Sequence, residues 1–209
     1  MRQLLLISAL ITWHPSGHTP SDRGPAPAQG VVPATTRRAI TADTVIDGVP
    51  CARTTRARAE FHANGRLLEC PLSRDASFGP QQLPRGSWVL LHADGSINGA
   101  WLSRDTPLSG ISCKGDGYKQ WSVRFYPTAE LRLCFLRVTT VIEGVPCRAG
   151  TFWGEIRGGQ NTAVHLHRNG RLARCQVAHD TTVGGVRYAA WEVVTRDSTG
   201  RATADRVRR

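Results

Sequence analysis

Three histidines of the chain could bind a metal ion together. His62, His92 and His167 each lie three residues before a glycine in a turn-like motif. Neutral imidazole is a common ligand for transition metals, and it changes its charge at about pH 6.5. One alternative is therefore a secreted metal-dependent hydrolase that uses this histidine column. Tyr126 takes the same place in a further copy of the motif, which favours aromatic rings packed beside the turns, and we assign no metal site.

Aspartates recur at a second fixed place, ten residues after the turn position. They are Asp75, Asp105 and Asp180, with Thr139 in the corresponding place of a further copy. Carboxylates can act as general acids or bases, but a catalytic site is one asymmetric group and these residues repeat. We expect them to accept hydrogen bonds from turn backbone. The chain has no nucleophile-elbow, zinc-protease, phosphate-loop or dinucleotide-binding motif, so we expect no enzyme and no cofactor.

The six cysteines follow the same repeat. Each copy that has cysteines has two, one after a short aliphatic segment ending in glycine and one five residues after the turn position. The second copy has Gln82 and Ala100 at these places. We predict three disulfides, which need an oxidising compartment: Cys51–Cys70, Cys113–Cys134 and Cys147–Cys175. A zinc site is not expected, because no two cysteines have the close spacing of a zinc motif.

Four aromatic residues are the candidate binding residues. Phe152 and Trp153 lie in a run, 151–161, that only the fourth copy has, and insertions in repeat proteins often carry the binding site. Trp101 and Phe135 fall on the strand face opposite the predicted core, where an exposed pair could contact protein or glycan. Three further tryptophans near the start of a strand are expected to pack in the core or between copies: Trp88, Trp121 and Trp191.

These residues must be positioned by five copies of one hairpin-like unit. The copies align on a turn position, at Gly65, Gly95, Ala129, Gly170 and Gly200, and we number them units 1 to 5 in that order. Pairs such as Asn64-Gly65 between apolar runs predict two-residue turns in which both residues have positive φ. Apolar residues four and six positions before the turn alternate with more polar ones, which is typical of a strand with one buried face.

The fold class that follows is all-β. Five tandem units of about 30 residues, each with two or three short strands, must stack to bury a common core, because one hairpin alone is marginally stable. The pattern fits a repeat-built meander, a solenoid-like sheet or a closed barrel. We place this disulfide-linked β-repeat domain at residues 41–209.

The first residues are typical of an export signal. Arg2 precedes an apolar run from Leu4 to Trp13 that is too short to span a bilayer, and Ala26-Pro27-Ala28 offers a cleavage site. We predict a signal peptide over 1–28 and a flexible linker over 29–40. No later segment has membrane-spanning length, so we expect a secreted, periplasmic or cell-surface protein.

The net charge of +11 does not by itself indicate nucleic-acid binding. Of the 27 basic residues only Lys114 and Lys119 are lysines, and the arginines are spread along the chain. This distribution favours a solvated basic surface, and nucleic acid is not an expected partner.

The motifs Phe61 to Leu67 and Leu166 to Leu172 resemble MORN-like repeats, and they are also similar to uncharacterised exported bacterial proteins built from such copies. The resemblance covers about residues 41–209, although MORN units are shorter and have no cysteine pairs. It implies a repeat architecture and supplies no catalytic or binding residues. Together these expectations describe a non-enzymatic secreted or cell-envelope module that binds protein or glycan on a β-repeat surface.

Overall fold

The computed structural model describes residues 35–54, 59–115, 122–151 and 162–202, which belong to one compact unit, Pro33–Arg209. The predicted signal peptide 1–28, the candidate residues Phe152 and Trp153, and Trp121 lie outside the described residues. Within the described ranges the secondary structure is β, and no helix there is long and apolar enough to cross a membrane.

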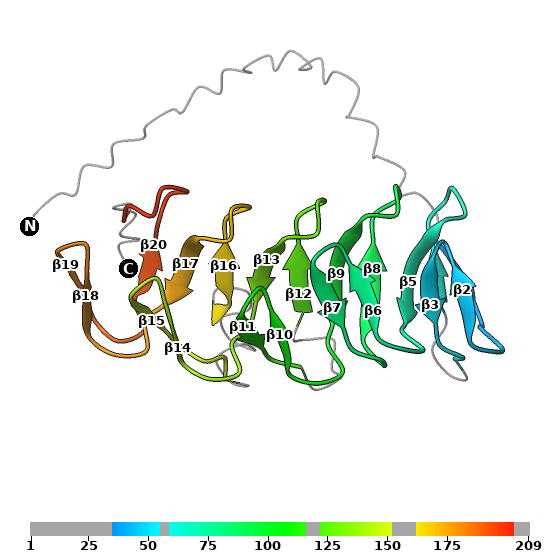
Figure 1. Cartoon of the computed structure of the whole chain (residues 1–209), viewed down its shortest axis with the longest axis horizontal. Coiled ribbons are helices and arrows are strands. Elements are labelled where there is room, and N and C mark those ends of the chain that lie inside the picture. The colour runs from blue at the N-terminus through cyan, green and yellow to red at the C-terminus, as the bar shows by residue number, and fades with distance from the viewer. Residues whose placement is uncertain (1–34, 55–58, 116–121, 152–161, 203–209) are drawn as a thin grey trace, which may run out of the picture. The chain divides into compact units, whose positions relative to one another are not determined.

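A ten-stranded antiparallel sheet is the larger of two layers (Figure 1). Each of its strands pairs with the sheet strands that come before and after it in the chain, so the sheet is an open meander and the all-β class is confirmed. The strands in spatial order are β1 (Thr36–Arg38), β4 (Ala59–Phe61), β5 (Leu67–Pro71), β8 (Trp88–Leu91), β9 (Ile97–Trp101), β12 (Ser122–Phe125), β13 (Leu131–Cys134), β16 (Val164–Leu166), β17 (Leu172–Gln176) and β20 (Val193–Thr195).

Five two-stranded hairpins form the second layer, and they alternate along the chain with the sheet strands (Figure 1). Units 1 to 4 thus each have a small hairpin followed by two sheet strands, four strands in place of the two or three that we predicted, and the described part of unit 5 has three. The small hairpins are β2 (Thr44–Ile46) with β3 (Val49–Cys51), β6 (Ala76–Phe78) with β7 (Gln81–Leu83), β10 (Thr106–Leu108) with β11 (Ile111–Cys113), β14 (Thr140–Ile142) with β15 (Val145–Cys147), and β18 (Thr181–Val183) with β19 (Val186–Tyr188).

The main core lies between the sheet and the small hairpins. Val89 and Leu91 on sheet strand β8 are at most 1% exposed, and Leu83 and Leu108 from the hairpins belong to the same buried cluster. Side chains alternate between the two faces of a strand, so Trp88 and Leu90, the residues on either side of Val89, point to the opposite side of the sheet. We call that side, which faces away from the small hairpins, the outer face.

The turns of the sheet hairpins differ from the predicted type. The His62 carbonyl accepts a hydrogen bond from the Gly65 amide, and the His62 amide donates to the Arg66 carbonyl, both at 2.9 Å. Gly65 has φ of 82°, and Asn64 does not have positive φ. This is a longer loop with a glycine bulge, and the prediction of two-residue turns there was wrong. Four of the five small hairpins instead have two-residue turns with both φ positive, as at Glu143-Gly144 (47° and 78°). The hairpin of β6 and β7 differs, because its turn is Gly79-Pro80 and proline has a fixed negative φ.

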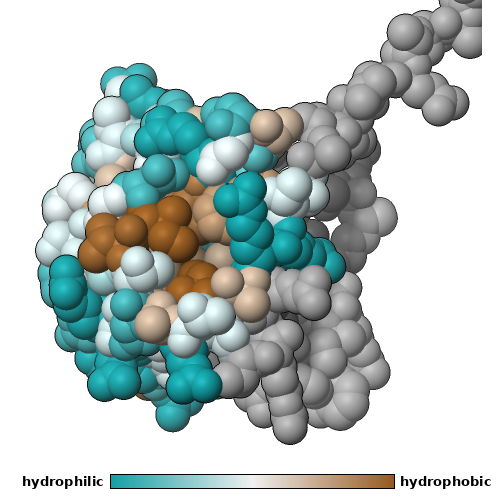
Figure 2. Space-filling view, turned by 90° about the vertical axis from the view of Figure 1, so that its right-hand side faces the viewer, coloured by the Kyte–Doolittle hydropathy of each residue, from teal (hydrophilic) through white to brown (hydrophobic). Residues whose placement is uncertain are grey.

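The β domain begins before residue 41. β1 pairs with β4 in the sheet, and Ile40 is 5% exposed in the core, so the end of the predicted linker 29–40 is part of the fold. The three residues of β1 are exposed, and its two arginines are charges of the kind that protect an edge strand from pairing with another chain. At the end of the array where β2 and β3 lie, Figure 2 has a small hydrophobic group ringed by hydrophilic residues, and Val45 there is 57% exposed.

The three disulfides join the two layers. Each links the last residue of a small hairpin to a strand of the sheet, and the pairings Cys51–Cys70, Cys113–Cys134 and Cys147–Cys175 are confirmed. In unit 2 the residue that corresponds to the hairpin cysteine is Leu83, not Gln82, because Leu83 pairs with Ala76 as Cys113 pairs with Thr106. Leu83 and Ala100 are both buried, so an apolar pair takes the place of a disulfide.

Candidate functional site

Two of the three column histidines, His62 and His167, bind backbone carbonyls of the next unit. Nε2 of His62 lies 3.1 Å from the Leu91 carbonyl, and Nε2 of His167 lies 2.9 Å from the Arg196 carbonyl. Tyr126, in the same column, donates from its hydroxyl to the Leu166 carbonyl at 2.9 Å. Because a carbonyl only accepts, Nε2 of both histidines donates here, and one of the two nitrogens that could bind a metal is already used. Among the described residues no group of three or more His, Cys, Asp or Glu side chains is placed to hold a metal ion.

The turns of units 1 and 4 share the sequence His-x-Asn-Gly-Arg and hold the following turn in the same way. Asn64 donates from Nδ2 to the Ala93 carbonyl at 3.1 Å, and Arg66 donates to the Asp94 carbonyl. In unit 4, Asn169 donates to the Ser198 carbonyl at 2.9 Å and Arg171 donates to the Thr199 carbonyl. We call the His, Asn and Arg side chains of each such turn a turn clamp. The turns that they hold belong to units 2 and 5.

Each turn clamp also depends on a glycine and an acid. The guanidinium of Arg66 lies where a Cβ of Gly95 would be, so a side chain at Gly95 would displace it. In unit 4, Nε of Arg171 lies 2.9 Å from Oε1 of Glu143, and Arg196 lies 3.3 Å from Oε2 of the same carboxylate. Burial raises the pKa of Glu143, but the hydrogen bonds and charges of Arg171 and Arg196 outweigh burial and hold that pKa below its ordinary value of 4.5.

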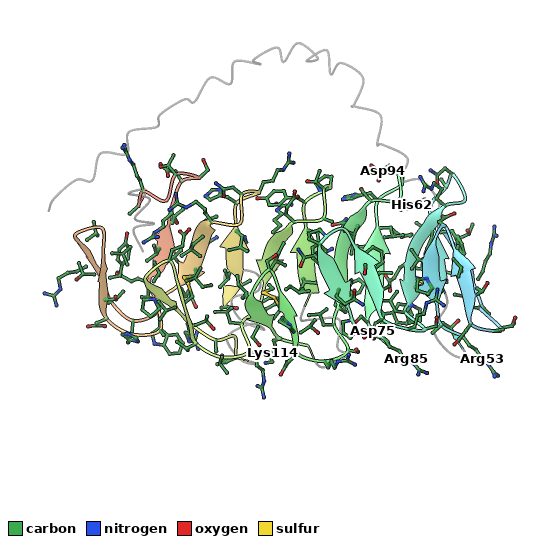
Figure 3. All side chains as sticks on the ribbon, viewed as in Figure 1. Arg53, His62, Asp75, Arg85, Asp94 and Lys114 are labelled. Carbon is green, nitrogen blue, oxygen red and sulfur yellow. A yellow bond between two sulfur atoms is a disulfide. The ribbon has the colours of Figure 1, made fainter. Side chains whose placement is uncertain are left out.

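The aspartate column closes the bases of the small hairpins. Asp75 accepts from the Arg85 amide at 2.7 Å, Asp105 from the Gly115 amide at 2.9 Å, and Asp180 from the Ala190 amide at 2.8 Å. Asp43 and Thr139 make the corresponding bond at the small hairpins of units 1 and 4. Figure 3 places Asp75 and Arg85 at one end of the sheet strands, and His62 and Asp94 at the other. The expectation that these aspartates bind backbone is confirmed.

The outer face carries one continuous row of side chains across all ten strands. The row begins with an ion pair, in which Nε of Arg37 lies 2.7 Å from Oε1 of Glu60. Cross-strand pairing then defines the order of the row: Arg37, Glu60, Glu69, Leu90, Gly99, Arg124, Leu133, His165, Arg174 and Thr195. Acidic residues are confined to its first strands, and an apolar stretch separates them from Arg124.

Two tryptophans lie directly opposite each other beside this row. Trp88 on β8 pairs with Trp101 on β9, with Pro71 and Ser122 on the flanking strands. Both tryptophans are half-buried, as are Leu90 and Pro71. Directly opposite residues have Cβ atoms about 4.5–5.5 Å apart, so the two indoles are adjacent. We call Pro71, Trp88, Leu90, Gly99 and Trp101 the tryptophan patch.

The structure separates the predicted pair Trp101 and Phe135. Both lie on the outer face, as predicted, but Phe135 is 3% exposed and forms a small second core with Leu133 and Ala163. An exposed pair of these two residues was therefore a wrong expectation. Trp101 instead has Trp88 as its partner.

Trp88 is the residue that sequence reasoning misplaced. We expected it to pack in the core or between units, and it lies on the outer face, opposite Trp101. A signal was present, because Trp88 is an odd number of residues before Gly95, whereas the core residues Val89 and Leu91 are an even number before it. Trp191, expected to behave like Trp88, is 53% exposed and packs 3.6 Å from the guanidinium of Arg148.

In comparisons with known proteins, no protein-family model, curated protein or solved structure matches the chain.

Proposed function

We propose that the chain is a non-enzymatic secreted or cell-envelope module that binds glycan on the outer face of its sheet. The observation that carries this proposal is the cross-strand pair of Trp88 and Trp101, which lies away from the core and within a mostly apolar group. Tryptophan combines a large apolar ring with a polar N–H and loses little conformational entropy on binding. Three disulfides fit an oxidising compartment such as the periplasm or the cell exterior.

A glycan fits this patch better than a protein partner does. The apolar group is small and is bordered by charged side chains, with Glu69 on one side and Arg124 on the other. A pyranose ring has apolar C–H faces for the indoles and hydroxyl groups at its edge for the polar border. A stable protein interface needs about 800 Å² on each partner with a larger apolar centre.

The hydrolase alternative, built on His62, His92 and His167, has less support. The repeated histidines are accounted for by hydrogen bonds to the next unit at His62 and His167. No observation on the described residues adds an acid, a nucleophile or further ligands beside them. We therefore propose binding without catalysis.

The test is binding of the purified full chain to a panel of neutral and acidic polysaccharides, measured by affinity electrophoresis and titration calorimetry. We expect Trp88→Ala and Trp101→Ala each to weaken binding about tenfold or more, as loss of a central aromatic contact does. Trp191→Ala is the matched control, because this exposed tryptophan lies outside the outer-face rows, and it should bind like the wild type. Circular dichroism and thermal melts of all variants report whether the fold is intact.

Two results would overturn the proposal. One is that the wild type binds no polysaccharide of the panel, in which case a protein-docking face would be the better reading. The other is equal weakening in Trp191→Ala and in the patch variants. The pair Phe152 and Trp153 remains a second predicted site, and Phe152→Ala/Trp153→Ala belongs in the same assay.

A further inference from the structure

We propose that the glycan bound at the tryptophan patch is acidic, and that Arg124 on β12 binds its carboxylate. This inference rests on the proposed function, because it concerns the same face. It adds the chemical class of the ligand and names the residue that selects it. A polymer that contains uronic acids is the simplest ligand that has both apolar ring faces and carboxylates along its length.

Arg124 is next to the tryptophan patch. It pairs across the strands with Gly99, and Ser122, two residues earlier on the same face, pairs with Trp101. Diagonal neighbours on one face of a sheet are about 7–8 Å apart, within reach of a long side chain. A ligand stacked on Trp101 therefore lies within reach of the Arg124 guanidinium.

Gly99 provides the space in which the Arg124 side chain lies. A Cβ placed on Gly99 would be 3.0 Å from Cδ and 3.1 Å from Nη1 of Arg124, and 2.7 Å from the Val123 carbonyl oxygen. The stem and the guanidinium of Arg124 thus lie across Gly99 on β9, the strand that also carries Trp101. This arrangement holds the charged group at the border of the apolar surface.

Arg124 has no anionic partner within the part of the chain that the structure describes. Among residues 35–54, 59–115, 122–151 and 162–202, no hydrogen bond or ion pair involves its guanidinium, and the acids of its row are on β4 and β5. Glu69 on β5 is three strands away, about 14 Å at the usual strand spacing. Glu60, one strand farther, is paired with Arg37.

The electrostatic surroundings agree with this geometry. Burial lowers the pKa of Arg124 below its ordinary value, and the positive charge of Arg132 lowers it further. The guanidinium remains charged near neutral pH, because arginine is not deprotonated in proteins. A half-buried cation without a counter-ion gains from an anion, and a guanidinium binds a carboxylate through two parallel hydrogen bonds.

The test compares polygalacturonate and hyaluronan with their carboxyl-reduced counterparts, at 0.15 M salt, on the full chain. We expect the wild type to bind the acidic forms about tenfold or more tightly than the reduced forms, since a charge-assisted pair is lost on reduction. Arg124→Gln should remove this preference and leave binding of the reduced forms unchanged. Arg124→Lys keeps the charge without the planar fork, and it should retain part of the preference.

Arg187→Gln is the control for non-specific attraction, because Arg187 is an exposed arginine on β19 in the other layer. Equal loss of acidic binding in Arg187→Gln and Arg124→Gln would overturn the inference, since net charge alone would then explain it. Equal affinity of the wild type for acidic and reduced forms would also overturn it, while the proposed function would stand. Absence of binding to every form overturns both. If Arg124→Gln melts much lower than the wild type, Arg124→Lys decides the matter.

Discussion

At the scale of single residues, most polar side chains that repeat along the chain bind backbone. His62 binds the Leu91 carbonyl, Asp75 binds the Arg85 amide, and Asn64 binds the Ala93 carbonyl. Each such bond satisfies a backbone group at a turn or between units, and the same requirement recurs in every unit. Residues that occur once, such as Trp101 and Arg124 on the outer face, are not explained by building a unit. This difference is why we place the binding site on them.

Glu143 makes a prediction about acid stability. Its pKa in the folded chain lies below 4.5, so the folded state favours the ionised carboxylate. The stability that it contributes is present above pH 4.5 and is lost as the pH falls through the lowered pKa. We expect Glu143→Gln to lower the free energy of unfolding by about 0.5–1 kcal/mol at pH 7, the range of a partly exposed ion pair.

The measurement is a series of thermal melts from pH 7 to pH 2.5 on the wild type and Glu143→Gln. The two melting temperatures should differ at neutral pH and converge at the acidic end, where the wild-type carboxylate is protonated. A constant difference over the whole series would show that charge at Glu143 is not the cause. Glu192→Gln is a useful control, because Glu192 is exposed and its carboxylate accepts from the Ala189 amide, not from an arginine of a turn clamp.

At the scale of elements, disulfides and turn clamps complement each other. Units 1, 3 and 4 have a disulfide, and units 2 and 5 do not. Units 2 and 5 are the ones that receive three side-chain hydrogen bonds from the preceding turn. The donors are His62, Asn64 and Arg66 in one case and His167, Asn169 and Arg171 in the other. A unit without a covalent link between its layers is thus held by its neighbour.

The substitution Asn64→Asp tests whether the turn clamp stabilises unit 2, because it replaces only the side-chain amide nitrogen of Asn64 with an oxygen. The Oδ1 of Asn64 accepts from the Arg66 amide at 3.1 Å, and aspartate keeps that bond. The donor to the Ala93 carbonyl is lost, and a negative charge is placed beside that carbonyl. We expect amides of the unit 2 turn, His92 to Ser96, to exchange several-fold faster, because local opening follows the weakest contacts.

Hydrogen exchange followed by mass spectrometry measures this effect. The turn of unit 3, from Tyr126 to Glu130, is the internal control and should keep its wild-type rate. If the turns of units 2 and 3 accelerate equally, Asn64 acts on the stability of the whole domain and the clamp is not a local device.

At the scale of the whole molecule, the domain is two layers that must be joined many times. The sheet and the small hairpins share one core, and three disulfides connect them along the array. Backbone bridges accompany each disulfide, as between Cys113 and Leu136. Neighbouring units contribute to a continuous core, so the stability lost when one link is removed is distributed over the units beside it.

Unit 2 supplies the design for a disulfide replacement. Cys113→Ala/Cys134→Ala should lower the free energy of unfolding by about 3 kcal/mol, the loop-closure value for a link between residues 21 apart. Cys113→Leu/Cys134→Ala copies the buried pair Leu83 and Ala100, and it should recover part of that loss by filling the core. Denaturant unfolding of both variants and the wild type measures the difference. Equal stability of the two variants would mean that the leucine does not fit at position 113.

Much of this architecture is determined by the sequence itself, because it depends on local spacing. The turn positions, the alternation before them and the two cysteine columns all lie within one unit, and they predict the all-β class and the three disulfides. The hydrogen bonds of the aspartate column also follow, since each spans ten residues around one small hairpin. Such features need no knowledge of how units pack, because the chain segments involved are already close.

Only the tertiary structure decided the features that arise between units and between layers. The turn clamp joins residues that are 28 or 29 positions apart in the chain. Its donors and their acceptors lie in different units, so the sequence of one unit does not show that they meet. Burial of Phe135 and partial exposure of Trp101 differ although both have the same place in their units, because exposure depends on what packs against each strand. The position of Arg124 over Gly99, and its distance from every acid of its row, follow from the order of strands in the sheet. Long-range pairing sets these relations, and no local pattern contains them.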